Sequence, residues 1–238
     1  MTGGLSQLIP FIRLLRAGDS FLMYPSGTRT RTGLFVEYRD AFREPGAVSL
    51  FLAQAQRRRP DVKVAAALMT RTYNPVKDMS AIVFCEPHYL PPGADRAAQR
   101  EFDARLVRVM AEQVEINVPH VISALCYSRC LRRGGDIVSP SVLFAAAKTV
   151  FSALEGRRVD PAAETELEEE LDKTLAFLAK KGALTRHRGR VRLNRNAILA
   201  SPSHDLHYMV KNPVKHFVNQ ILHLPDVTRI IQNVAQEM

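Results

Sequence analysis

Two arginines and four hydroxyl residues alternate within a short stretch of this chain that is bounded by glycines. The stretch reads Tyr24-Pro25-Ser26-Gly27-Thr28-Arg29-Thr30-Arg31-Thr32-Gly33. A guanidinium group gives phosphate a forked pair of N–H donors, and the hydroxyls and backbone N–H groups of a loop add to it. Gly27 and Gly33 permit backbone turns that a β-carbon would block. The pattern indicates a loop that binds a small anion; from the spacing alone, an exposed basic hairpin loop is the alternative.

The elements expected before this loop place it at the end of a strand. The apolar run Phe21–Tyr24 predicts a short buried strand, which Pro25 ends because proline has no N–H for the ladder. Apolar residues at helical spacing from Leu5 to Leu15 predict a preceding helix, and Gly18-Asp19 predicts the turn between helix and strand.

The loop closely resembles the third signature block of the glycerophospholipid acyltransferases, F-P-E-G-T-R-S-R-x-G. The order of helix, Gly-acidic turn, strand and arginine block is also similar to that of the family. The resemblance implies that Arg29 and Arg31 bind the phosphate of the acceptor, with Gly27 and Thr28 shaping the turn. Ser26 belongs to the same expected phosphate site, but it stands where the family has a glutamate.

The activity that the resemblance implies belongs to phospholipid biosynthesis. A fatty acyl group moves from the thioester of acyl-CoA or acyl carrier protein to glycerol 3-phosphate or a related phosphorylated acceptor, and no further cofactor is expected. In the family, the histidine of an H-x-x-x-x-D block deprotonates the acceptor hydroxyl. None of the seven histidines here has an aspartate five positions later. We therefore expect this chain to be a C-terminal part that carries the acceptor-phosphate block, with the parent protein an enzyme and these residues alone inactive.

Two other functions are left open by the sequence. A non-catalytic relative that binds phospholipid at a membrane surface would also lack the base. A basic nucleic-acid binder is the less favoured alternative, because the formal net charge of +9 and the pI of about 9.8 attract any polyanion.

The residues after the arginine block predict an α/β region that extends to about residue 117. Helices are expected over 46–58 and 96–116, and strands over 62–69 and 81–84. The second strand leads into Cys85-Glu86-Pro87-His88-Tyr89-Leu90-Pro91, which resembles a G-E-P-x-x-L-P strand end of the family. The Val-Pro-Ile block of the family has no recognisable counterpart. We expect a mixed sheet flanked by helices, the C-terminal part of an acyltransferase domain, over residues 1–117.

The remainder, 118–238, predicts a mostly helical region. Apolar periodicity indicates helices over 119–131, 139–155 and 160–181, with Ser139 as an N-cap and Pro140 in the first turn. A basic hairpin is expected over 183–193, turning at Arg188-Gly189.

The order of helix and basic hairpin is typical of a winged helix. An acidic run from Glu164 to Glu170 argues against DNA binding, because it lies on the helix that would enter the groove of the DNA. Further on, Asn212-Pro213-Val214-Lys215-His216 keeps the Asn-x-x-x-His spacing of a C-terminal segment in larger glycerol-3-phosphate acyltransferases, and an ordinary amphipathic helix explains it equally well.

The spacing of the cysteines and the lengths of the apolar runs bear on metal binding and on membrane association. Cys85, Cys126 and Cys130 have no metal-ligand spacing and are expected to be reduced thiols. No apolar run approaches the roughly 20 residues that span a bilayer. We expect a cytoplasmic protein, peripheral to an anionic membrane, with no metal; nucleic acid is an unlikely partner.

Overall fold

The computed structural model describes residues 3–23, 32–34, 48–57, 63–132, 136–201 and 207–238, with only the backbone for 3–7. The chain forms two compact units. Unit 1 comprises residues 1–30, 35–70 and 83–110, and unit 2 comprises 31–34, 71–82 and 111–238. Helices and small antiparallel sheets make up the described residues, so the predicted combination of α and β structure is confirmed. Within residues 1–117 the described strands form two separate two-stranded sheets, where the sequence had predicted one mixed sheet, and the described strands of 118–238 form a three-stranded sheet.

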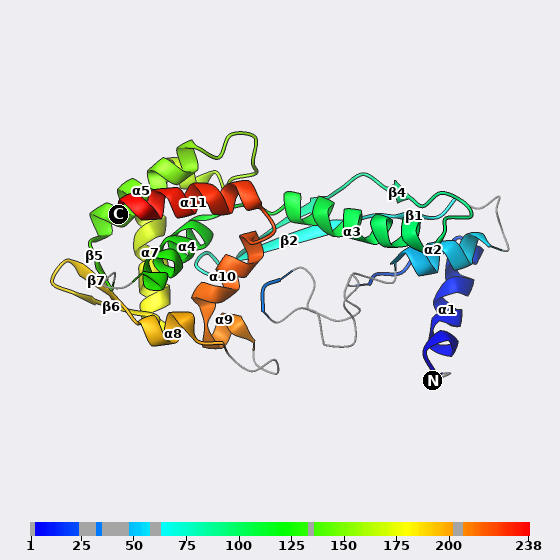
Figure 1. Ribbon diagram of the computed structural model, residues 1–238, viewed down its shortest axis with the longest axis horizontal. Helices are drawn as coiled ribbons and strands as arrows, with labels where there is room; N and C mark the ends of the chain where they lie inside the picture. Colours follow the sequence, from blue (N-terminus) through cyan, green and yellow to red (C-terminus); the bar gives the residue numbers. More distant parts are fainter. Residues whose placement is uncertain (1–2, 24–31, 35–47, 58–62, 133–135, 202–206) are drawn as a thin grey trace. The chain divides into compact units, whose positions relative to one another are not determined.

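Unit 1 is built on three helices and one short strand pair (Figure 1). The helices are α1 (Gly3–Ala17), α2 (Val48–Gln56) and α3 (Arg96–Glu112), of which the last two residues belong to unit 2; β1 (Ala65–Ala66) pairs antiparallel with β4 (His88–Tyr89). The core is apolar and comprises Leu52, Ala55, Val64, Ala66, Leu68, Leu90, Phe102, Leu106 and Met110.

Polar contacts hold both ends of α2. The backbone N–H and the hydroxyl of Ser49 donate to the carboxylate of Asp103, at 2.9 and 2.6 Å. A carboxylate suits this position because the N-terminal N–H groups of a helix have no partner within the helix. At the other end, the Arg16 guanidinium donates to the carbonyl oxygens of Gln54 and Ala55, which joins α1 to α2.

The strand predicted over residues 21–24 is not formed in its described part, residues 21–23. Leu22 is 80% exposed, so the expectation of a buried strand was wrong there. The ring of Phe21 instead lies 5.0 Å from that of Phe11 and 5.3 Å from that of Phe51. Aromatic packing against α1 and α2 therefore takes the place of strand pairing. Tyr24 lies outside the described residues.

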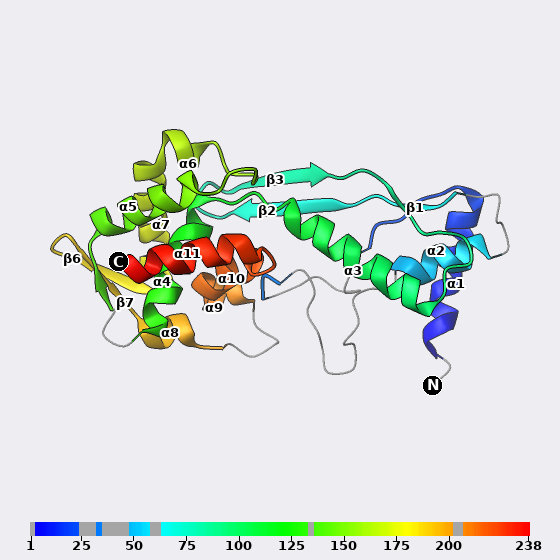
Figure 2. The ribbon, with the colours of Figure 1, turned by 45° about the horizontal axis from the view of Figure 1, so that its top comes forward.

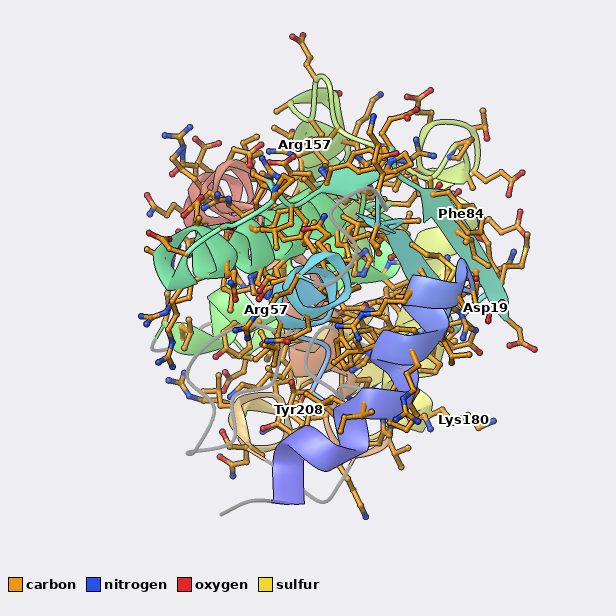
Figure 3. All side chains as sticks on the ribbon, turned by 90° about the vertical axis from the view of Figure 1, so that its right-hand side faces the viewer. Asp19, Arg57, Phe84, Arg157, Lys180 and Tyr208 are labelled. Carbon is orange, nitrogen blue, oxygen red and sulfur yellow. The ribbon has the colours of Figure 1, made fainter. Side chains whose placement is uncertain are left out.

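A two-stranded hairpin is formed by β2 (Met69–Asn74) and β3 (Met79–Phe84), which are connected by the turn 75–78 (Figure 2). Asp78 in this turn has a φ of 52°, in the left-handed region. Phe84, labelled in Figure 3, is 76% exposed at the end of β3.

Unit 2 is organised around α4 (Val118–Leu131) (Figure 1). Five helices contact it: α5 (Pro140–Ser152), α7 (Leu167–Lys180), α8 (Arg195–Leu199), α10 (Pro213–Ile221) and α11 (Pro225–Glu237). The first nine residues of α4 are all buried, which explains its apolar composition on every side. Asn117 caps the helix: its side-chain oxygen accepts from the N–H of His120, and its own N–H donates to Nδ1 of His120.

The middle of unit 2 alternates short strands with helices. The elements are β5 (Ile137–Val138), α5 (Pro140–Ser152), α6 (Ala162–Thr165), α7 (Leu167–Lys180), β6 (Leu184–His187) and β7 (Arg190–Leu193). The three strands form one antiparallel sheet in the order β5-β7-β6.

Two sequence predictions for this part are confirmed and one is corrected. The hydroxyl of Ser139 accepts from the N–H of Val142, as expected of an N-cap. The hairpin turns at Arg188 and Gly189, with φ of 47° and 71°, the positive values that two-residue hairpin turns require. The helix predicted over 160–181 is broken at Glu166, whose backbone is non-helical, into α6 and α7.

Unit 2 ends in four helices: α8 (Arg195–Leu199), α9 (Tyr208–Lys211), α10 (Pro213–Ile221) and α11 (Pro225–Glu237). Over the described part of the chain, no helix combines the length and the apolar character needed to cross a membrane.

Candidate functional site

The residues that the sequence assigned to phosphate binding are Ser26, Gly27, Thr28, Arg29 and Arg31, and all of them lie outside the described residues. The end of the same block, Thr32-Gly33, is described together with Leu34, and all three residues belong to unit 2. The contacts of Thr32 and Gly33 therefore show what the end of the arginine block packs against.

The backbone of Thr32 is fixed to α10. The side-chain amide of Asn219 donates to the carbonyl oxygen of Thr32 at 2.8 Å, and both residues are buried. The N–H of Leu34 donates to the Thr32 hydroxyl at 3.4 Å, closing a local turn. Thr32 is thus held by a residue that is distant in the sequence and by one of its neighbours.

Gly33 is in contact with the backbone of α10. Its φ is +91°, and a β-carbon at this position would lie 2.3 Å from the carbonyl oxygen of His216. Real β-carbons do not approach an oxygen so closely, and the positive φ independently disfavours other residues. Only glycine fits both the conformation and the space, which explains the glycine at the end of the arginine block.

The Asn-x-x-x-His segment belongs to the same contact. Asn212 caps α10: its side-chain oxygen accepts from the N–H of Lys215, and its amide donates to the carbonyls of Ile198 and Ala200. One turn later, His216 faces Gly33. The asparagine therefore connects α8 to α10, and the histidine is adjacent to the end of the arginine block.

His216 is a buried, neutral histidine. Burial lowers its pKa from 6.5 to about 4, with smaller contributions from His120 and His207. Its Nδ1 has no hydrogen-bond partner among the described residues. Its ring lies 5.9 Å from that of Phe217, edge to face.

His120 is a second buried histidine, with both ring nitrogens occupied. Nδ1 accepts from the N–H of Asn117, so Nε2 carries the proton and donates to the side-chain oxygen of Gln220 at 2.8 Å. Burial lowers the pKa of His120 to about 4, although the bond to Gln220 opposes the shift. Its ring also packs edge to face on Phe217. His120 therefore joins the start of α4 to α10.

Neither buried histidine is suited to deprotonate an alcohol. A base with a pKa near 4 takes a proton from a hydroxyl far less effectively than one near neutrality. His120 in addition has no free ring nitrogen. The described contacts instead hold Thr32 and Gly33, the end of the arginine block, against α10.

The cysteines are not activated nucleophiles. Burial raises the pKa of Cys126 to about 12 and that of Cys130 to about 11, and both thiols are free. Across the described ranges, no group of three or more His, Cys, Asp or Glu side chains is placed to hold a metal ion.

A separate hollow of about 890 Å³ is lined by α5, α6 and the first turns of α7. Its lining combines apolar and acidic side chains and includes Phe144, Phe151, Val159, Leu167, Glu164, Glu166, Glu168, Glu169, Asp172 and Lys148. The carboxylates at the start of α7 suit the positive end of the helix dipole, which accounts for them without a ligand.

Sequence reasoning missed Asn219, His120 and Gln220. The Asn117–His120 spacing is that of a capping box, in which histidine replaces the usual glutamate, and this signal was available in the sequence. Asn219 gives no local signal, because its partner Thr32 is 187 residues away.

No protein-family model, no curated protein and no solved structure matches this chain.

Proposed function

We propose that this chain is the acceptor-binding part of an O-acyltransferase of phospholipid biosynthesis. In this proposal Arg29 and Arg31 hold the phosphate of glycerol 3-phosphate or a related acceptor, and Ser26, Gly27 and Thr28 complete the loop. The acyl donor is acyl-CoA or acyl carrier protein, and no cofactor takes part.

One observation supports this proposal most directly. The end of the arginine block, Thr32-Gly33, is in contact with α10, the helix that begins with the Asn212-x-x-x-His216 spacing. The two stretches resemble separate blocks of the same family and lie nearly 200 residues apart in the sequence, yet they contact each other within unit 2.

The proposed contribution of this chain to the reaction is positioning. The acceptor hydroxyl attacks the thioester carbonyl, and its proton must pass to a base. Arg29 and Arg31 fix the acceptor through its phosphate, and Asn219 fixes the end of the loop that carries them. The base is absent from these 238 residues, which have no H-x-x-x-x-D block. That absence equally favours the second candidate, a non-catalytic relative that binds phospholipid at a membrane surface.

A winged-helix arrangement in unit 2 and a location at a membrane surface are part of the same proposal. The order β5, α5, α7, β6, β7 and the sheet order β5-β7-β6 support a winged-helix arrangement in unit 2. The net charge of +9 supports a cytoplasmic protein that associates with an anionic membrane surface.

Titration of the 238-residue chain with glycerol 3-phosphate tests the proposal, with glycerol as the ligand that lacks a phosphate. Arg29→Ala should weaken binding about 10- to 100-fold, because a charge-assisted hydrogen bond contributes about 1.5–3 kcal/mol. Arg29→Lys should restore only part of it, since lysine cannot bind phosphate bidentately. Arg57→Ala, at the exposed end of α2, is the control. If Arg29→Ala, Arg31→Ala and Arg57→Ala bind equally well, the arginine block is not the phosphate site.

A further inference from the structure

We propose that the solvent-facing side of the β5-β7-β6 sheet is the surface with which the chain binds anionic lipid headgroups. This names the contact surface for the membrane association proposed above, and it rests on that part of the proposed function.

Strand register places the basic side chains on one face. Thr185 is opposite Arg192, His187 is opposite Arg190, and Ile137 of β5 is opposite Arg192. Directly opposite residues of an antiparallel pair point to the same side of the sheet, and alternate residues of a strand do so as well. All five side chains therefore share one face, and all five are exposed.

The other face of this sheet is buried except at Arg186. Leu184, Val191, Leu193 and Val138 alternate with the exposed residues and are buried. The hairpin thus cannot turn its arginines inward without exposing four apolar side chains, so its orientation is fixed.

Among the described residues, no carboxylate forms an ion pair with Arg190 or Arg192 on the exposed face. Residues 179–193 contain six Lys and Arg residues and no Asp or Glu. Arg186 alone of the hairpin arginines pairs with a carboxylate within the described residues, that of Asp172 at 2.5 Å, and it lies on the opposite face. Arg188 occupies the turn, and Lys180 and Lys181 precede the hairpin at the end of α7; Lys180 is labelled in Figure 3.

One observation favours lipid over nucleic acid. Ile137, 50% exposed, lies on the arginine face itself, opposite Arg192. An apolar side chain among cations suits the boundary between headgroups and acyl chains, whereas the phosphate backbone of a nucleic acid gives it no apolar partner.

Vesicle binding by the full 238-residue chain tests the proposal. Phosphatidylcholine vesicles with and without phosphatidylglycerol serve as probes, at low and at high salt. The double variant Arg190→Glu/Arg192→Glu should bind anionic vesicles at least about tenfold more weakly, because each basic residue near an anionic surface contributes about fivefold. The matched control is Arg96→Glu/Arg229→Glu, two exposed arginines on α3 and α11 that change the net charge by the same amount.

The outcomes separate the proposal from its alternatives. Wild-type affinity for anionic vesicles in the control, with affinity lost only in the hairpin variant, supports it. An equal loss in both double variants, with circular dichroism showing both folded, would mean that net charge alone attracts the chain and would overturn it. Hairpin-dependent binding to duplex DNA that exceeds binding to vesicles would overturn it in favour of nucleic acid. Acceptor titration is the independent readout: the hairpin variant should retain glycerol 3-phosphate affinity, whereas Arg29→Ala should lose it and retain vesicle binding.

Discussion

Asn219 and Thr32 are joined by a hydrogen bond of 2.8 Å although 187 residues separate them. The bond runs from a side chain on α10 to a backbone carbonyl at the end of the arginine block, and both residues are buried. Because a buried hydrogen bond is favourable on balance, this one amide contributes to the position of Thr32 and to the stability of unit 2.

Asn219→Ala should lower the free energy of unfolding by about 0.5–1.5 kcal/mol, the usual net contribution of a hydrogen bond such as the one that its amide donates to Thr32. Asn219→Asp should be at least as destabilising, because a carboxylate has no N–H to donate and repels the carbonyl oxygen. Urea unfolding followed by circular dichroism measures the difference, and Asn233→Ala on the exposed side of α11 is the control. An Asn219→Ala protein as stable as Asn233→Ala would show that the bond contributes nothing.

Gly33→Ala should be more destabilising than Gly182→Ala. Both glycines have positive φ, but a β-carbon at Gly182 meets nothing within 4 Å, whereas one at Gly33 lies 2.3 Å from the carbonyl oxygen of His216. Gly182→Ala should therefore cost only the conformational strain, about 1–2 kcal/mol. Gly33→Ala should cost a further 1–3 kcal/mol, roughly, for the displaced backbone. Thermal unfolding of the two variants side by side measures the difference, and equal melting temperatures would contradict the close contact.

Unit 2 should lose stability on acidification between pH 6.5 and about 4. His120 and His216 are neutral when buried, with pKa values of about 4, whereas the unfolded chain takes up protons near pH 6.5. The stability that each contributes is complete above the unfolded pKa and falls as the pH drops toward the folded one, by about 2 kcal/mol per histidine between pH 7 and pH 5. His120→Gln should flatten the slope of unfolding free energy against pH in this window; an unchanged slope would mean that His120 is not buried in its neutral form.

Lys77→Met should destabilise unit 2 by about 1–3 kcal/mol, because Lys77 neutralises carboxylates that are withdrawn from water. Its ammonium lies 3.2 Å from Asp160 and 3.7 Å from Glu170, whose side chain is 1% exposed. Lys180→Met, an exposed lysine at the end of α7, should have little effect. A double-mutant cycle with Glu170→Gln gives the coupling energy directly, and a value near zero would show that the two side chains do not interact.

The 238 residues alone should not acylate glycerol 3-phosphate, because neither buried histidine is a competent base and no His-x-x-x-x-Asp pair is present. A radiometric assay with acyl-CoA and glycerol 3-phosphate measures this. Turnover well above the uncatalysed rate would require another base in the chain.

Local chemistry in the sequence predicted local structure well. The hairpin at 183–193 followed from Arg188-Gly189, because a two-residue turn needs two positive φ values and glycine supplies one of them. The start of α5 followed from Ser139-Pro140, since the cap and the first-turn proline act within one helical turn.

Contacts between residues far apart in the sequence explain why two of the predicted elements were wrong. Phe21 belongs to an apolar run that looks like a strand, but Phe11 and Phe51 pack on its ring, and residues 21–23 form no strand. The continuous helix expected over 160–181 is broken at Glu166, and Ala163 before the break and Leu167 after it are both buried. The local sequence does not show which distant residues will pack against these side chains.

At the candidate site, the sequence indicated the arginine block and His216 but not what joins them. Arg29 and Arg31 as phosphate ligands remain a prediction, because they lie outside the described residues. Gly33 was assigned to a turn, and its second role, close approach to α10, depends on a helix whose position the sequence does not reveal.

The division of unit 2 into three sequence segments has a consequence for synthesis of the chain. Unit 1 ends at Met110, so all its residues leave the ribosome before α4 exists, whereas residues 31–34 and 71–82 must await the body of unit 2. Domains acquire structure as they emerge, N-terminal parts first. The hydrogen bond between Thr32 and Asn219 therefore forms only after α10 has been made, and the length of the loop that it closes adds to the entropic cost of this contact.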